Sequence, residues 1–289
     1  MSIVIDILIN GLFLGGLYAL FGLGLTLIFG VMRIANIAHG EIAVAGALAL
    51  FTLGGNLPVH PLVLLPVVMV LAFGLGWLLQ AQLINRVLSA DPMPALLLTF
   101  GLSVVLQNLM VEIYGADNRS IDIGTIKTAG FQIGGVTLGY LPLAIFLLAL
   151  VLFGLLHLGL QHTRLGRAIR ATSQDADIVA LFGIRQKRVF ALVMALAAGF
   201  AALAGMLLAM RSTITPFSGA ERLLIAFEVI VIGGLGSIWA SYLGGIALAL
   251  VHVASFYFDP ASGLLYGHLT LLLFLLLRPQ GIAGKVVTR

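Results

Sequence analysis

The sequence contains no cysteine and very little charge. None of its 289 residues is cysteine, and Asp, Glu, Lys and Arg together make up 9% of the chain. The absence of cysteine excludes disulfides, thiol catalysis and thiolate metal sites. The scarcity of charge, together with 61% hydrophobic residues and a mean hydropathy of +1.16, excludes an ordinary soluble domain. The composition therefore predicts an all-α, polytopic integral membrane protein.

Motifs for catalysis and for cofactor binding are also missing. The chain has no Walker A glycine loop, no nucleophile elbow and no dinucleotide fingerprint. We therefore expect no enzyme activity and no cofactor bound by this chain. His39 and Glu41 do not have a zinc-site spacing and lack a third clustered ligand, so no metal site is expected either. The formal net charge of +4 is interpreted as a topology signal, and no nucleic-acid partner is expected.

Long apolar windows predict the membrane spans. A spanning helix needs about 20 residues, and the windows predict about 8–9 transmembrane helices in a single domain over residues 1–289. Residues 1–6 carry no basic region and no cleavage site, so we expect a retained first helix rather than a signal peptide. The windows are 3–30, 35–53, 61–84, 94–114, 140–160, 189–210, 222–237, 238–258 and 263–277.

The basic residues predict the orientation of the chain. The loop 161–188 holds six of the 15 Lys and Arg residues. If this loop is cytoplasmic, only Arg119, Lys127, Arg211 and Arg222 lie on the outside, as the positive-inside rule requires. We therefore predict an external N-terminus and a cytoplasmic C-terminus. The segment 115–139 becomes the main external loop, which either meets a soluble partner or is a solvated connector.

Polar residues inside the apolar windows indicate a transport path. Carboxylates at membrane depth are costly unless they face a partner or a wet cavity, and irregular backbone survives there only where it is buried in protein or lines a cavity. The candidates in two such stretches are Asn36, His39, Glu41, Glu228, Gly233, Gly234 and Gly236. An alternative interpretation is that the two glutamates satisfy backbone amides or His39 and fix helix ends. Ser103, Gln107 and Asn108 are predicted to share one helix face, where they line a polar cavity or form interhelical hydrogen bonds.

The loop 161–188 is predicted to contain a short, capped helix. Thr172 and Asp175 have capping-box spacing, Asp175 and Asp177 lie in the predicted first turn, and Gly183 is the predicted stop. The helix presents an apolar edge made by Ile178, Leu181 and Phe182. Upstream, Arg167 and Arg170 either reach lipid headgroups or pair with acidic groups of a docked protein. Such an exposed apolar edge predicts that a soluble partner binds here.

Six collinear stretches carry a resemblance to a known family. They are 33–41 (RIANIAHGE), 106–115 with LQN and YG, 166–175 (GRAIRATSQD), 181–184 (LFGI), 233–237 (GGLGS) and 278–281 (RPQG). With these stretches, over nearly its whole length, the chain resembles the permease subunits of ABC importers for branched-chain amino acids. Residues 238–245 depart from the pattern, since bulky Trp239 stands where small residues are usual.

The resemblance implies a multi-pass protein of the bacterial inner membrane with several partners. These are a second homologous permease, two cytoplasmic ATPases that bind ATP and Mg²⁺, and a periplasmic substrate-binding protein, besides membrane lipid. It also implies that the segment 172–183 couples to the ATPases. Related importers carry urea, short amides or other amino acids, so the substrate stays open. The alternative from a different class is a proton-coupled secondary transporter that uses Glu41 or Glu228.

Overall fold

The computed structural model describes residues 2–89, 91–133 and 136–282, and these are almost entirely helical. A two-stranded antiparallel hairpin accompanies the helices, with Gly130 opposite Gly139. The elements are α1 (Ser2–Met32), α2 (His39–Asn56), α3 (Pro61–Leu79), the π-helix η1 (Gln80–Ile84), α4 (Asn85–Val87), α5 (Met93–Tyr114), η2 (Gly124–Lys127), β1 (Gly130–Ile133), β2 (Val136–Gly139), α6 (Tyr140–His162), α7 (Arg164–Gln174), α8 (Ala176–Leu181), α9 (Gln186–Arg211), η3 (Pro216–Ser218), α10 (Gly219–Gly233), α11 (Ile238–Phe258), η4 (Pro260–Ser262) and α12 (Gly263–Leu277).

Within the described ranges, six helices are long and apolar enough to cross a membrane. They are α1, α3 with its extension, α5, α6, α9 and α11. The three remaining windows form α2 with 18 residues, α10 with 15 and α12 with 15. A polytopic helical membrane protein is therefore confirmed. The windows were expected to give about 8–9 complete spans, but three of them form shorter helices.

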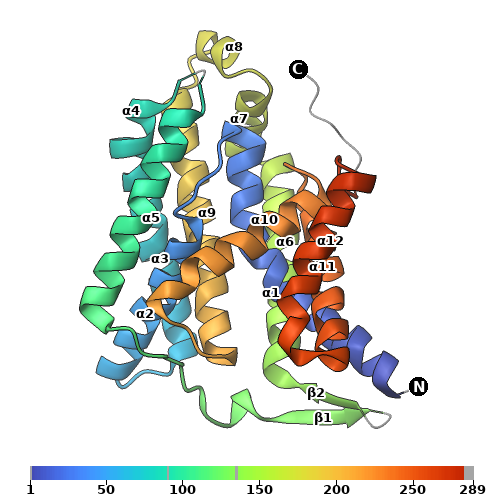
Figure 1. Cartoon of the computed structure of the whole chain (residues 1–289). Coiled ribbons are helices and arrows are strands. Elements are labelled where there is room, and N and C mark those ends of the chain that lie inside the picture. Colours follow the sequence, from blue (N-terminus) through green and yellow to red (C-terminus); the bar gives the residue numbers. More distant parts are fainter. Residues whose placement is uncertain (1, 90, 134–135, 283–289) are drawn as a thin grey trace.

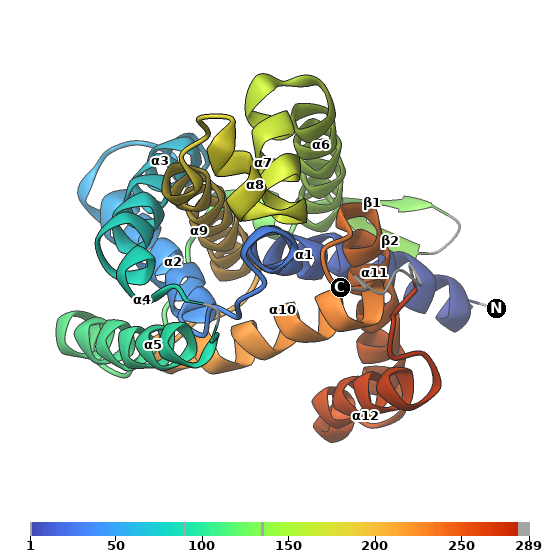
Figure 2. The same cartoon turned by 90° about the horizontal axis from the view of Figure 1, so that it is seen from above.

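The centre of the bundle is formed by α1 and α9, which pack against each other. Each also packs along a second long helix, α1 along α11 and α9 along α3 (Figure 2). Small residues allow these close approaches. A Cβ atom on Gly15 would overlap the backbone of Ile246, and one on Gly205 would overlap the carbonyl of Ala43. The small-residue faces thus place the backbones of the central helices in contact.

Two helices begin in the interior of the bundle rather than at its ends. After α1 ends, residues 33–38 turn back without helical structure, and α2 begins at half height (Figure 1). After α9 ends, residues 212–218 return from the opposite end, and α10 begins at half height and runs obliquely across the bundle. We call α2 and α10 the half-helices. Their late starts explain why their windows are too short for full spans.

The element order is repeated in the opposite direction. In Figure 1, α1 rises, the chain re-enters, and α2 descends, followed by α3 rising and α5 descending. In the second series the directions are reversed: α9 descends, the chain re-enters, α10 rises, α11 descends and α12 rises. The pairing of α1 with α11 and of α9 with α3 fits this inverted order. Such inverted repeats with broken helices are typical of transporter folds.

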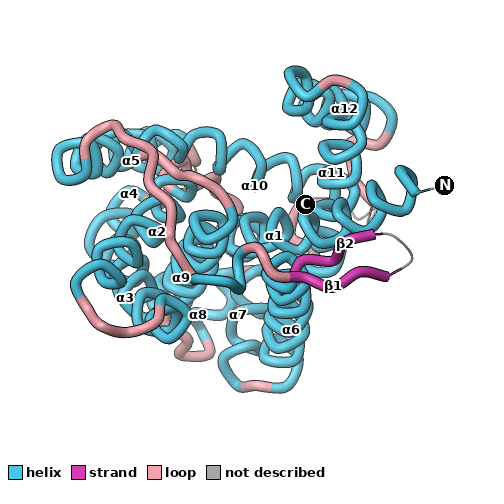
Figure 3. The backbone as a smooth tube through the Cα atoms, turned by 90° about the horizontal axis from the view of Figure 1, so that it is seen from below, coloured by secondary structure: helices cyan, strands magenta, loops and turns pink. Residues whose placement is uncertain are grey.

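The two polar connections lie at opposite ends of the bundle (Figure 1). The helices α7 and α8 stand at one end, and the hairpin β1–β2 lies at the other. Figure 3 shows that the connection from α5 to the hairpin crosses this second end of the bundle. It is more than a solvated connector, because Ile121 and Ile123 are buried and the amide of Ile121 donates to the carbonyl of Ala209 at 3.0 Å.

Candidate functional site

The polar loop 161–188 forms two helices, not one. Thr163 caps α7, since its hydroxyl accepts a hydrogen bond from the amide of Gly166 at 2.9 Å. The predicted cap at Thr172 is therefore wrong. Thr172 lies inside α7, where it is buried and donates to the carbonyl of Ala168 at 2.8 Å, as hydroxyls within helices commonly do. The helix that contains Thr172 therefore starts nine residues earlier than expected, after Thr163.

The second helix, α8, follows directly after Asp175. The Asp175 carboxylate accepts a hydrogen bond from the amide of Ile178 at 3.0 Å, so this aspartate is the cap and α8 has 6 residues instead of about ten. The side chain of Asp177 lies outside the described part of the structure. The stop is confirmed, because the helix ends at Leu181 and Gly183 adopts a φ of 77°, which favours glycine.

The outer edge of α8 is apolar and uncovered. The exposed fractions are 53% for Ile178, 84% for Leu181 and 79% for Phe182, while Val179 is buried against the rest of the chain. The helix stands beyond the ends of the long helices (Figure 1). An exposed patch of large apolar side chains outside the membrane marks an interaction surface.

The arginines of α7 bind the end of the preceding helix. Arg170 donates to the carbonyl of Leu160, and Arg167 donates to the carbonyl of His162 at 3.4 Å. Both carbonyls belong to the last turn of α6, where cations are favoured by the helix dipole. A Cβ atom on Gly166 would overlap the same turn. These arginines therefore position α7 and α8 on the end of α6.

The N-terminal ends of the two half-helices meet at Glu41. Glu41 lies in the first turn of α2, and its carboxylate lies against Gly219, the first residue of α10. Only 2% of the residue is exposed. Ser103 of α5 donates to Oε1 at 3.4 Å, while Oε2 has no partner among the described residues. The positive ends of two helix dipoles thus converge on one carboxylate.

Asn36 and His39 hold the first interruption in place. The Asn36 side-chain oxygen accepts from the amide of Ala38 at 3.1 Å, and Thr99 accepts from the amide of Ile37 at 3.3 Å. His39 Nε2 bonds to the carbonyl of Phe21 at 3.1 Å. All three side chains are buried. Asn36 and Thr99 thus satisfy backbone amides of the non-helical segment, and His39 joins the start of α2 to the backbone of α1.

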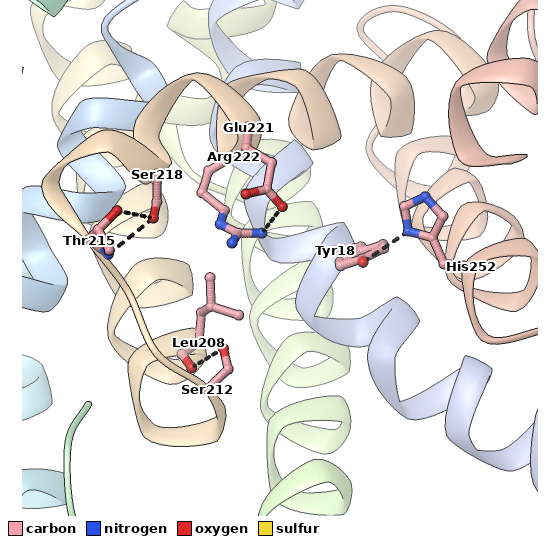
Figure 4. Close-up of polar contacts among 8 residues, drawn as sticks. All are labelled: Tyr18, Leu208, Ser212, Thr215, Ser218, Glu221, Arg222 and His252. Atoms are coloured by element: carbon pink, nitrogen blue, oxygen red, sulfur yellow. Dashed lines mark hydrogen bonds and ion pairs between the residues drawn. The ribbon is translucent and has the colours of Figure 1, made fainter. Parts of the chain in front are cut away.

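The second interruption is held mainly by backbone pairing. Arg119 and Ile214 exchange two backbone hydrogen bonds of 2.8 Å each. Thr215 and Ser218 form a capping box ahead of α10, with the Thr215 amide donating to Ser218 at 3.1 Å (Figure 4). The loop from α5 therefore fastens the segment that leads into the second half-helix.

Glu228 lies near the other end of α10. It is fully buried, one of its carboxylate oxygens contacts His268 of α12, and the other has no partner among the described residues. From Gly219 to Glu228 the helix rises about 13 Å, so the two predicted path carboxylates do not share one site. In each half, however, a side chain from an outer helix reaches the carboxylate of the half-helix, Ser103 in one case and His268 in the other.

The predicted glycines lie where α10 turns into α11. Gly234 and Gly236 adopt φ values of 116° and 79°, which non-glycine residues rarely adopt. A Cβ atom on Gly233 would overlap the backbone at Ala240, and Gly236 lies against Gly30 of α1. These glycines allow close packing of the turn.

The three polar residues of α5 do not share one face. Ser103 contacts Glu41, and Gln107 is half-buried one turn later. Asn108 is exposed and donates to the carbonyl of Val104 in its own helix at 2.8 Å. The predicted single face is wrong for Asn108, because five residues along a helix turn a side chain well away from the first.

The two opposite lateral faces of the bundle differ in the polarity of their exposed residues. The exposed residues of α3 from Val63 to Leu78 and of α6 from Ala144 to Leu158 are all apolar. The face formed by α5, α10 and α12 includes Glu221, His268 and Asn108 at least partly exposed. Sequence reasoning missed Thr99, Glu221 and His268. It placed Arg222 on the outside, but Arg222 lies in the first turn of α10, which begins at half height in the bundle.

These features define a multi-pass membrane protein with interrupted helices that meet at half height, the architecture of transport proteins. A family model described as the permease component of branched-chain amino acid transport systems matches residues 7–277, and the chain belongs to this family.

Curated relatives are similar over nearly their full length. The high-affinity branched-chain amino acid transport system permease protein BraD of Pseudomonas aeruginosa is 32% identical, with 96% of this chain and 95% of the relative covered. LivH of Escherichia coli is 28% identical, with 96% and 94% covered. A probable LivH of Methanocaldococcus jannaschii is 26% identical, with 96% and 92% covered. No solved structure matches the chain.

Proposed function

We propose that this protein is the inner-membrane permease subunit of an ABC importer for branched-chain amino acids. The observation that carries the proposal is the match of the family model over residues 7–277, supported by relatives named as branched-chain amino acid permeases. The fold supports a transport role, because two half-helices meet at half height with a buried carboxylate between them.

The subunit works with partners that supply energy and substrate. Two ATPase subunits bind ATP and Mg²⁺ and dock against α8, whose apolar edge needs a groove to cover it. This end is cytoplasmic, the N-terminus is external, and the C-terminus is cytoplasmic, in agreement with the basic residues of α7. A binding protein delivers substrate to the opposite end, where residues 115–139 lie.

A second homologous permease completes the path on the face formed by α5, α10 and α12. Polar side chains at membrane depth avoid lipid and face a partner or a wet cavity, and this face carries Glu221 and His268. The apolar faces of α3 and α6 are turned toward lipid. The candidate path residues are Asn36, His39, Glu41, Ser103, Gln107, Asn108, Glu228, Gly233, Gly234 and Gly236, with the first two acting through the backbone they hold.

Removal of the apolar edge of α8 tests the coupling role. Leu181→Asp and Phe182→Asp place charges in the docking surface without touching the bundle, since both residues are mostly exposed. Loss of a buried interface anchor costs about 2 kcal/mol, or about thirtyfold in affinity. We therefore expect the reconstituted complex to lose substrate-stimulated ATP hydrolysis while the permease is still inserted.

The matched control is Leu155→Ala, which trims an equally large side chain on the lipid-facing surface of α6. It should leave ATP hydrolysis and leucine uptake unchanged. Full coupled activity in both α8 variants would contradict the assignment of the docking surface. Failure of the wild-type complex to import leucine, isoleucine or valine with ATP and a cognate binding protein would contradict the proposed substrate.

A further inference from the structure

An ion pair lies in the first turn of the second half-helix. Glu221 Oε1 and Arg222 Nη1 are 3.0 Å apart, and their side chains are 43% and 15% exposed. Figure 4 shows both side chains projecting from α10 on the same side as Tyr18, with Leu208 of α9 and Ser212, which follows α9, below them. Since α10 begins at half height in the bundle (Figure 1), two charges are held at membrane depth.

The helix geometry does not impose this pair. Adjacent residues on a helix do not face each other, so the two side chains must bend to meet. Desolvation of charges at membrane depth offsets the attraction within such a pair, which makes it weak evidence for stability. In membrane proteins, charged groups at depth mark substrate or ion pathways. A structural role alone therefore leaves the presence of this pair unexplained.

Arg222 has donors to spare. A guanidinium offers five N–H groups in a fixed fork that matches a carboxylate. Glu221 is its ionic contact among the described residues, and its Nε is buried without a hydrogen-bond partner among them. The neighbouring hydroxyls have hydrogen bonds of their own, since Thr215 and Ser218 bond to each other and Ser212 donates to the carbonyl of Leu208. Arg222 is thus equipped to bind a further carboxylate.

The surroundings suit a molecule with both charges. The first turn of a helix favours an anion, which complements Arg222 as a carboxylate binder. Glu221 is partly exposed and offers a carboxylate to a cation. Glu41 adds a second carboxylate at Gly219, with Oε2 buried and without a partner among the described residues. Residues 219–222 of α10, together with Glu41 of α2, which contacts Gly219, thus carry charges of both signs.

We propose that the first turn of α10 is a binding subsite for the zwitterionic head of an α-amino acid, in which Arg222 receives the carboxylate and Glu221 the ammonium group. This inference rests on the proposed function and specifies the chemistry of its path. Substrate binding exchanges the internal ion pair for two ion pairs with the substrate. Recognition therefore depends on both head groups, while the aliphatic side chain is left to apolar surroundings.

The test uses the complete complex of both permeases, both ATPases and the binding protein in proteoliposomes. Radiolabelled leucine uptake and leucine-stimulated ATP hydrolysis are measured for Arg222→Gln, Arg222→Lys and Glu221→Gln. We expect Arg222→Gln and Glu221→Gln to reduce uptake at least about tenfold, while stimulated hydrolysis stays within about twofold of wild type. Arg222→Lys keeps the charge but loses the fork, and we expect an intermediate uptake.

Arg86→Gln is the matched control. It removes an exposed arginine that bonds only to Gln82 among the described residues, at 3.4 Å, and it should change neither quantity. Wild-type uptake in Arg222→Gln and Glu221→Gln would overturn the subsite. Parallel loss of uptake and hydrolysis in all three variants would also overturn it, because a merely structural pair predicts that result. A wild-type complex that hydrolyses ATP without importing leucine would instead contradict the proposed function.

A second measurement separates the two head groups. Leucine binding to the purified permease–ATPase complex without the binding protein is measured in competition with leucinamide, which lacks the carboxylate, and with 4-methylpentanoate, which lacks the ammonium group. We expect both analogues to compete at least about tenfold more weakly than unlabelled leucine. Equal competition by either analogue would overturn the assigned partner of that head group.

Discussion

The two interruptions of the helices have the same form but are held by different chemistry. Residues 33–38 are fixed by buried side chains, with Asn36 and Thr99 accepting from backbone amides. Residues 212–218 are fixed by the backbone, since Arg119 and Ile214 exchange two hydrogen bonds of 2.8 Å. The segment before a half-helix can therefore be anchored either by buried side chains or by backbone pairing. The comparison predicts that the two interruptions respond differently to substitution.

The contact between the half-helices should be the most sensitive point, because Gly219 lies against the buried carboxylate of Glu41 with no room for a Cβ atom. Gly219→Val would drive a branched side chain into the carboxylate of Glu41. Overpacking in a core commonly costs about 1–3 kcal/mol, and here the obstacle is a buried charge. We expect a thermal shift of many degrees or loss of folded protein in detergent, measured by fluorescence-detected size-exclusion chromatography.

The control is Gly101→Ala on α5, where a Cβ atom would meet open space. It should be neutral or slightly stabilising, since alanine is the better helix former. A stable Gly219→Val protein with unchanged transport would show that the half-helices can separate at no cost. The contact between Gly219 and Glu41 would then not be needed by either interruption.

The side-chain anchor of the first interruption comes next. Thr99→Val keeps the shape of the side chain but removes the acceptor for the amide of Ile37. A buried donor without a partner costs about 1–3 kcal/mol, so we expect the melting temperature to fall by several degrees. Thr270→Val, whose hydroxyl bonds within its own helix, is the control. Equal shifts for both threonines would show that the first interruption does not depend on this side chain.

The smallest effect is expected for the side chain of Arg119. Arg119→Ala leaves both backbone bonds to Ile214 in place and removes a bond to the carbonyl of Tyr114 and a contact with the Phe51 ring at 5.1 Å. We expect a loss of about 1 kcal/mol. Arg119→Pro, which also removes the amide donor, should cost more. If the two variants melt at the same temperature, the second interruption is held by side chains after all.

The sequence predicts the membrane class and most helix positions, because long apolar windows leave few alternatives in lipid. It does not show where a helix begins relative to the depth of the bundle. The window 222–237 becomes a half-helix that starts at Gly219, and hydropathy is the same for a helix that starts at the surface or at half height. The signals that were available are Thr215, Pro216 and Ser218, a cap followed by proline at the first helical position.

The candidate site is predicted in part. Glu41 was identified because a carboxylate in an apolar window is rare, and the structure places it between the half-helices. Its contact with Ser103 joins two predicted residues, whereas Glu228 lies elsewhere with His268. Such pairings depend on which helices are neighbours, and local spacing carries no information about that. The cap at Thr172 was wrong for a related reason, since Thr163 offers a competing start nine residues earlier.

The loop that crosses the end of the bundle is connected to the segment that leads into α10. Its backbone is joined to Ile214 by two hydrogen bonds, and Ile214 precedes the first residue of α10 by only five positions. Residue 119 and the first residue of α10 are thus linked by two backbone hydrogen bonds and five residues of chain. The end surface of the bundle and the interior start of α10 therefore belong to one hydrogen-bonded backbone connection.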